Sequence, residues 1–357
     1  MNISGPQAGH KKVGLLAKPL YFLATVQLAT YYIRDVPSYL RLTQYEDGAA
    51  HMPFQGRLMM MFLLRWAHAS IIWITLADGL NRFVPWLLPQ CTPEAALQLC
   101  IDVACIAVTG AVATRLYQAG SKEQLLVQWI YPLVLVLCVT TYILHITQNL
   151  RFYYDLPSMM FFSVGLYLIY FRWHSALFAA LFLIGTVNRE TTLFLLLFFV
   201  LARLAPDRRI DLRRLQDRQM WTVVVPLAAA WLAWHVWVGW VFRQNPSECT
   251  SKFLFNLILV LMPWTWPQLA GAGCYLFPVV LLLRRSIQDS TIRMWVWALP
   301  AWYAVMFFYG ILVETRIFGE LIGYIACVTA QIAEQGILSA LESRGWSNDE
   351  GLQAAGD

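Results

Sequence analysis

Small groups of charged residues interrupt a chain that is otherwise very apolar, and their types are those that acid–base and phosphate chemistry needs. They are mixed or acidic clusters, found at Arg34-Asp35, Glu46-Asp47, Arg151 to Asp155, Arg189-Glu190 and Glu314 to Glu320. Two adjacent carboxylates in a partly solvated site can acquire different pKa values, so that one of them can act as a base or as a metal ligand. Arginine forks can hold phosphate oxygens through paired hydrogen bonds. The clusters therefore indicate an active or binding site.

The composition places these clusters in a membrane protein. Hydrophobic residues make up 59% of the chain and charged residues 13%, whereas soluble domains are about 45–50% apolar. The apolar residues form continuous blocks rather than the alternating segments of a β-barrel, so we predict an all-α polytopic bundle. The net charge of +5 is explained by an arginine bias in cytoplasmic loops, and we expect membrane lipids rather than nucleic acid as partners. The oligomeric state is left open.

Ten spans are predicted, at about 14–33, 95–116, 125–147, 156–171, two short helices within 175–204, 221–242, 268–283, 294–312 and 318–338. Residues 34–94 are predicted to form a long outer loop with interfacial helices, because Arg65 and His68 interrupt its apolar stretch. The two runs in 175–204 are about 13 residues each, or roughly 20 Å of helix, which is short of the ~30 Å hydrocarbon core. We therefore expect a break at Asn188 to Thr192, buried in protein or lining a cavity.

The distribution of arginine and lysine sets the orientation. The loop 205–220 carries five arginines, and basic loops stay in the cytoplasm. This puts both termini in the cytoplasm, 34–94 outside and all the mixed clusters on the outer face. We expect one transmembrane domain over 1–340, a polar tail over 341–357, and a location in the bacterial inner (plasma) membrane.

The candidate catalytic residues are the acids of the first outer loop, Asp35, Glu46 and Asp47. The candidate substrate-binding residues are polar or aromatic and share the outer face: His51, Gln55, Arg57, Arg151, Tyr154, Asp155, Asn188, Arg189, Glu190, Glu314, Arg316 and Glu320. No metal ligands are assigned, because the seven cysteines follow no metal spacing. For any one pair the alternative is a structural ion pair between helix ends, and for any one arginine it is snorkelling to lipid headgroups.

The chain resembles the GT-C superfamily of membrane glycosyltransferases in the order of its features. These are a first span, a long outer loop with an acidic pair, and later polar clusters on the same face. The runs Phe152 to Ser158 and Asn188 to Thr191 also resemble segments of bacterial membrane proteins near that class, and Glu46-Asp47 is the nearest equivalent of an Asp-x-Asp motif. The resemblance implies a polyprenyl-phosphate-linked sugar donor, a first-loop carboxylate as base, and a lipid phosphate held by arginines with Mg²⁺ or Mn²⁺ as a possible cofactor.

Other classes remain open at this point. An enzyme like the O-antigen polymerases or ligases would share the lipid-linked substrate and the outer arginines. A lipid or solute transporter without catalysis would need ionisable residues at mid-membrane, whereas most charges here fall at predicted helix ends. A non-enzymatic assembly subunit is a further alternative. The donor sugar, the acceptor and the linkage are not determined by the sequence.

Overall fold

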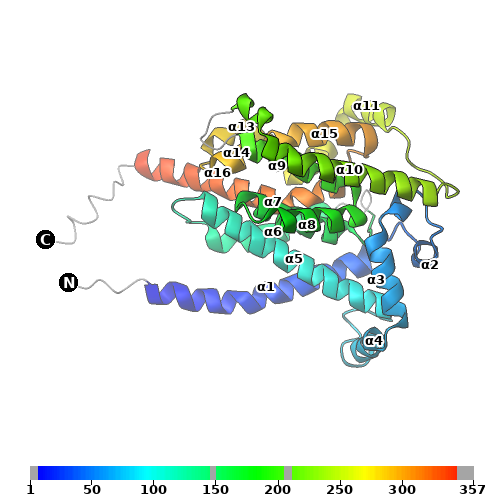
Figure 1. Cartoon of the computed structure of the whole chain (residues 1–357). Helices are drawn as coiled ribbons and strands as arrows, with labels where there is room; N and C mark the ends of the chain where they lie inside the picture. Colours follow the sequence, from blue (N-terminus) through cyan, green and yellow to red (C-terminus); the bar gives the residue numbers. More distant parts are fainter. Residues whose placement is uncertain (1–6, 145–149, 205–210, 344–357) are drawn as a thin grey trace.

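The computed structural model describes residues 7–144, 150–204 and 211–343. Within these ranges the chain is helical, with two isolated β-bridges and no β-strand. Its long helices run in broadly the same direction across the molecule, as Figure 1 shows for α1 (Gln7–Asp35), α5 (Pro93–Gly120), α10 (Arg218–Val241) and α16 (Ile322–Ser343). The predicted all-α class is confirmed.

Three helical stretches of the described chain are long and apolar enough to cross a membrane, namely Pro93–Gly120, Arg218–Val241 and Thr315–Ser343. They correspond to three of the predicted spans. Two helix pairs pass the same test together but are sharply bent: α3 (Leu58–Ala69) with α4 (Ile71–Phe83) by 76°, and Phe253–Leu261 with Pro263–Ala270 by 98°. The structure thus has three candidate spans, or up to five with the bent pairs, and the ten-span arrangement stays a prediction.

Shorter helices occupy most of the other predicted spans. They are α6 (Ile130–Cys138) with its π-helical continuation η3 (Val139–Ile143), α7 (Asp155–Tyr170), α8 (Ser175–Asn188), α9 (Phe194–Leu204), α13 (Leu276–Leu282), α14 (Ser290–Trp295) and α15 (Ala298–Tyr309). The predicted break within 175–204 is confirmed, because α8 ends at Asn188, Arg189 is extended, and the 3-10 turn η4 (Glu190–Leu193) precedes α9.

Short helical segments make up the connections. They are α2 (Leu42–Glu46), η1 (Phe54–Gly56), η2 (Val127–Trp129), η5 (Leu212–Gln216), α11 (Phe253–Leu261), η6 (Pro263–Thr265), α12 (Trp266–Ala270), η7 (Ala272–Tyr275), η8 (Arg284–Ser286) and η9 (Thr315–Leu321). The predicted tail 341–357 lies outside the described residues except for its first three, which end α16, and residues 205–210 of the basic loop also lie outside them.

The helices place the charged clusters at one end of the bundle, which we call the network end. The start of α7, the break after α8 and the segment η9 meet there, since Arg189 contacts both Asp155 and Glu320. The first loop is attached at the same end by backbone pairing of Ser38 with Arg151 and of Met52 with Ser247. In Figure 1 the described start of α1 and the end of α16 lie at the opposite end, away from α2 and α3.

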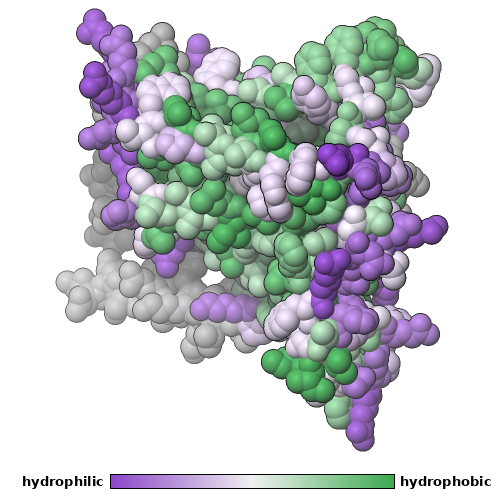
Figure 2. All heavy atoms as spheres, turned by 45° about the vertical axis from the view of Figure 1, so that its right-hand side comes forward, coloured by the Kyte–Doolittle hydropathy of each residue, from purple (hydrophilic) through white to green (hydrophobic). Residues whose placement is uncertain are grey.

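The surface between the two ends is apolar. Large hydrophobic side chains such as Leu20 and Leu23 on α1 and Leu232 and Val236 on α10 are more than half exposed. Figure 2 shows a broad apolar band between hydrophilic regions on either side of the molecule. Apolar surface of this extent is unfavourable in water and typical of contact with lipid, which agrees with a membrane protein.

Candidate functional site

Asp155, the first residue of α7, is the buried centre of an ion-pair network. Its Oδ1 lies 3.3 Å from Nη1 of Arg189 and 3.8 Å from Nη1 of Arg316. Its Oδ2 accepts a hydrogen bond of 3.0 Å from the hydroxyl of Tyr32 on α1. The Asp155 side chain is 0% exposed, and a buried carboxylate is strongly unfavourable unless it is paired and hydrogen-bonded. These contacts therefore hold together four segments that are distant in sequence.

Two more carboxylates extend the network along η9. Arg189 Nη1 also lies 3.2 Å from Oε1 of Glu320, and the hydroxyl of Thr191 donates a hydrogen bond to the same oxygen. Arg316 pairs with Glu314 through Nη2 and Oε2 at 2.5 Å. Arg189 thus bridges two buried carboxylates, and Asp155 is shared by two arginines.

A close backbone approach fixes η9 in this position. Gly319 precedes Glu320, and a Cβ atom at Gly319 would overlap the hydroxyl of Tyr142, which lies on η3. Only a glycine lets the backbone pass so near the tyrosine ring. The glycine therefore sets where the Glu320 carboxylate enters the network.

The break after α8 brings Arg189 and Glu190 into the site. Arg189 has φ −161° and ψ 143°, so the chain is extended for one residue between α8 and η4. The Asn188 side chain donates hydrogen bonds to the Tyr154 carbonyl at 3.2 Å and to the Ser158 hydroxyl at 2.8 Å, which ties the end of α8 to the start of α7. The Glu190 carbonyl accepts a 2.9 Å hydrogen bond from the Trp231 indole. The Arg189 carbonyl accepts a 2.8 Å hydrogen bond from the Thr192 hydroxyl, so both of these carbonyls at the break are paired within the protein, as expected of irregular backbone in an apolar setting.

The first loop reaches the network through Arg57. Its Nε donates a 2.9 Å hydrogen bond to Oε2 of Glu190, and its Nη2 bonds to Oε1 of the same carboxylate. The Arg57 side chain is 7% exposed but that of Glu190 is 33% exposed. The network therefore runs from fully buried Asp155 to a carboxylate that solvent reaches.

Aromatic rings lie beneath the arginines. The guanidinium carbon of Arg316 is 3.9 Å from the ring centroid of Phe152, and that of Arg57 is 4.3 Å from the ring centroid of Tyr154. Such cation–π contacts orient a guanidinium and stabilise its charge, more so when the pair is desolvated.

Several buried polar atoms of this region have no hydrogen-bond partner within the described protein. Around the network they are Arg57 Nη1, Arg189 Nε, Glu320 Oε2, Asn188 Oδ1 and the hydroxyl groups of Tyr142 and Tyr154. Each such group costs about 1–3 kcal/mol if it stays unpaired. A concentration of unpaired groups at one place is characteristic of a site whose polar atoms are completed by a ligand or ordered water.

The three candidate catalytic acids lie outside the ion-pair network. Asp35 forms a bidentate pair with its neighbour Arg34, at 2.8 and 2.9 Å, and both side chains are 37% exposed. Glu46 ends α2, and one of its carboxylate oxygens is buried with no hydrogen-bond partner among the described residues. Burial, with the nearby Glu94 carboxylate, raises the pKa of Glu46. Asp47 is exposed. Among the three, Glu46 has the environment most suited to a base.

The remaining first-loop candidates make contacts of their own. His51 Nδ1 lies 2.6 Å from Oε1 of Glu248, which also accepts the hydroxyl of Tyr39 at 2.6 Å. The buried Gln55 side chain accepts a 3.0 Å hydrogen bond from the Ala50 backbone, so it shapes the loop. The guanidinium of Arg151 lies over the Tyr153 ring, 5.5 Å from its centroid.

The sequence reasoning missed a line of polar residues on α5. Glu94, Gln98 and Asp102 are 5%, 2% and 0% exposed, and Gln98 donates a 2.8 Å hydrogen bond to Oδ1 of Asp102. Their i, i+4, i+8 spacing within an apolar helix is the signal that could have found them. Glu94 adjoins Glu46, while Asp102 lies near Asp155. Eight residues of helix span about 12 Å, so this line links the first-loop acid to the network.

The described residues contain no group of three His, Cys, Asp or Glu side chains that could hold a metal ion. The buried carboxylates of Asp155 and Glu320 are instead bridged by Arg189. This donor set does not fit Mg²⁺ or Mn²⁺, which prefer several oxygen ligands, and no chemical step is assigned to a cation.

Comparison of the chain with protein-family models, with curated proteins and with solved structures gave no match.

Proposed function

We propose that the chain is a membrane transferase, similar in type to the GT-C glycosyltransferases, that moves a sugar from a polyprenyl-phosphate-linked donor to an acceptor. The observation that carries the proposal is the meeting of three arginines from three separate segments, Arg57, Arg189 and Arg316, at one end of the bundle. Arg57 Nη1 and Arg189 Nε are buried and have no hydrogen-bond partner in the part of the chain that the structure describes. Donors held in place by carboxylates and aromatic rings are suited to bind a phosphate, because they lose little freedom on binding.

In this proposal the donor phosphate takes the place of Glu190 at the fork of Arg57. The Glu190 carboxylate matches a phosphate in charge sign and in its two hydrogen bonds to Arg57, and it is the network carboxylate most open to solvent. Asp155 and Glu320 stay in place and hold Arg189 and Arg316. Glu190 is therefore a competitor of the phosphate, which predicts opposite effects for changes at Arg57 and at Glu190.

The proposed base is Glu46. A raised pKa brings a carboxyl nearer to the working pH, where proton transfer is most effective. Its carboxylate takes the proton of an acceptor hydroxyl as that oxygen forms a bond to the anomeric carbon. The bond from the anomeric carbon to the phosphate oxygen breaks, and the lipid phosphate leaves with the electron pair, stabilised by the arginines.

The proposed orientation has ten spans, the network end outside and both termini in the cytoplasm of a plasma membrane, the inner one in bacteria. This orientation is supported by the way the charged segments divide between the two ends of the helical bundle. Residues 34–57, 151–155, 189–190 and 314–320 meet at the network end through the contacts described above. The basic residues Arg172, Arg218 and Arg284 adjoin ends of helices that face the other way, as the positive-inside rule requires.

The alternative is that the chain is a transporter or an assembly subunit and that the ion-pair network has only a structural role. It is favoured by the pairing of Arg57, Arg189 and Arg316 with carboxylates. Under this reading, changes at the network alter stability and leave phosphate binding untouched.

The test is a transfer assay on the full chain in nanodiscs. A panel of polyprenyl-phosphate-linked sugars is supplied together with membrane-extracted acceptors, and release of polyprenyl phosphate is measured. Glu46→Gln should slow release by about 10²–10⁴-fold with a melting temperature no lower than that of wild type. The matched control is Glu123→Gln, an exposed acid near the opposite end. Equal release by wild type and Glu46→Gln would contradict the assignment of the base, and no release from any donor would contradict the proposed reaction.

A further inference from the structure

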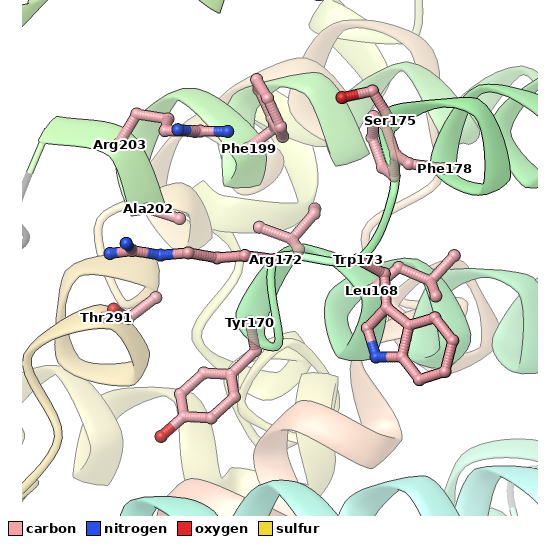
Figure 3. Close-up of a pocket in the computed structure, with 11 residues that line it drawn as sticks. Leu168, Tyr170, Arg172, Trp173, Ser175, Phe178, Phe199, Ala202, Arg203 and Thr291 are labelled. Atoms are coloured by element: carbon pink, nitrogen blue, oxygen red, sulfur yellow. The ribbon is translucent and has the colours of Figure 1, made fainter.

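A small pocket lies at the end of the bundle opposite the network. The end of α7, the start of α8, the last turn of α9 and Thr291 of α14 line it, as Figure 3 shows. The sixteen residues of α7 separate it from Asp155 by about 24 Å. The pocket is thus distinct from the proposed active site.

Two arginines, Arg172 and Arg203, make the pocket basic. In the view of Figure 3 their guanidinium groups lie on the same side of the pocket, with Ala202 between them. Tyr170, which lines the pocket, donates a 3.1 Å hydrogen bond from its hydroxyl to Oδ2 of Asp289. Neither guanidinium forms an ion pair with any residue that the structure describes, and no described acid lines the pocket. This sets the pair apart from the arginines of the network, which carboxylates satisfy.

Uncharged donors complete the lining. Thr291 contributes a hydroxyl beside Arg172, and Ser175 begins α8 on the other side of the pocket. Hydroxyl groups and the free N–H groups of a first helical turn hydrogen-bond phosphate and ester oxygens. The pocket therefore combines two cations with neutral donors.

Exposed apolar side chains lie next to the pocket residues in the sequence, and one of them, Trp173, lines the pocket. Phe171, Trp173 and Leu177 are 40%, 51% and 49% exposed, although they adjoin the arginine pocket in sequence. Aromatic side chains of this kind gather where the headgroup layer meets the acyl chains. A ligand that places its anion between the arginines and an apolar chain along these side chains would satisfy both features.

We propose that the Arg172–Arg203 pocket binds the phosphodiester headgroup of an anionic phospholipid from the leaflet at this end of the bundle, with its acyl chains along Trp173 and Leu177. Basic pockets between membrane helices at the cytoplasmic side bind anionic headgroups in this way. The arginine forks hold the phosphate oxygens, and the absence of a described acid in the lining favours an anionic headgroup over a zwitterionic one.

Native mass spectrometry of the detergent-solubilised full chain tests this. Wild type is titrated with dioleoylphosphatidylglycerol and, in parallel, with dioleoylphosphatidylcholine. We expect wild type to prefer the anionic lipid, and Arg172→Gln and Arg203→Gln each to weaken its binding about tenfold, as for loss of a charge-assisted hydrogen bond. The matched control, Arg218→Gln, changes an exposed arginine at the same end and should leave the preference unchanged. Ala202→Phe keeps both charges but blocks the space between them, and it should also weaken binding.

Four results would overturn the proposal. The first is that wild type shows no preference for the anionic lipid, and the second is that this preference is unchanged in both arginine variants and in Ala202→Phe. The third is that Arg218→Gln loses as much lipid binding as the pocket variants do. The fourth is that millimolar inorganic phosphate displaces the lipid. The last would assign the pocket to a free anion. If an arginine variant fails to elute as a folded monodisperse species, the Ala202→Phe result decides.

Discussion

Arg57 and Glu190, which are 133 residues apart in sequence, form a two-point ion pair through the Nε–Oε2 hydrogen bond of 2.9 Å and the Nη2–Oε1 hydrogen bond. This pair attaches the first loop to the break between α8 and α9. The pair also bears on function, because a phosphate would bind to the same N–H donors of Arg57.

The Arg57–Glu190 pair should contribute measurably to stability. Glu190→Gln leaves the buried guanidinium of Arg57 without a charged partner, and removal of one member of a buried pair costs about 3–5 kcal/mol, with the lower figure expected here because Glu190 is partly exposed. A double-mutant cycle with Arg57→Gln, measured by unfolding in detergent, should give a coupling energy of about 1–3 kcal/mol. Additive effects of the two changes would mean that the pair seen here does not form.

The raised pKa of Glu46 predicts a pH-dependent effect on stability. Burial, with the nearby Glu94, disfavours its charged form. A carboxyl whose pKa is higher in the folded protein stabilises the fold at low pH, and that contribution is lost as the pH rises through the folded pKa. Glu46→Gln should therefore melt at a higher temperature than wild type at neutral pH. The difference should vanish below the usual glutamate pKa of about 4.3.

The control for this experiment is Asp47→Asn, a matched change at the exposed neighbour. A higher melting temperature of Glu46→Gln that persists unchanged at low pH would show that the effect does not come from ionisation of Glu46.

Gly319 should be hard to replace. A Cβ atom there would overlap the Tyr142 hydroxyl, with the ring behind it, so Gly319→Ala forces η9 or the ring to move. Overpacking of this kind costs about 1–3 kcal/mol, and thermal unfolding should show the loss. Tyr142→Phe in the same chain removes the overlapping oxygen and should restore part of it. A melting temperature equal to that of wild type in Gly319→Ala would contradict the close approach.

The two ends of the bundle should lie on opposite sides of the membrane. Ser38 and Gln216 are both exposed, Ser38 near Arg151 and Gln216 just before α10. In a cysteine-free background, Ser38→Cys should react with an impermeant maleimide added outside intact cells, and Gln216→Cys should react only after permeabilisation. Reaction of position 216 from outside would reverse the orientation.

Much of the architecture could be predicted because apolar runs and helix breaks are local properties of the sequence. The all-helical class and the break at Arg189 follow from run lengths and charge positions. The sequence predicts that Asp155, Arg189 and Glu320 lie at the same end of the bundle, because successive helices alternate in direction. It does not predict that Arg189 pairs with both carboxylates, because these contacts depend on how the helices pack.

The polar line on α5 was missed for a different reason. Asp102 lies inside an apolar run, and the clusters that stood out in the sequence are those at helix ends. Its burial beside Gln98 becomes evident only when the helix is placed against the start of α7. The surroundings of Glu46, which include Glu94, His68 and Arg65, likewise depend on how α2, α3 and α5 pack.

The measurement that tests the central claim most directly is binding of a polyprenyl monophosphate to the purified chain and its variants in detergent, with melting temperatures recorded alongside. We expect Arg57→Lys to weaken binding about tenfold, because an ammonium cannot reproduce the two-point fork. Glu190→Gln should tighten it by removing the competitor of the phosphate. The matched control Arg34→Lys changes an exposed, paired arginine near the same end and should bind as wild type does. Unchanged binding in Arg57→Lys and Glu190→Gln, with altered melting temperatures alone, would contradict the account and identify the network as purely structural.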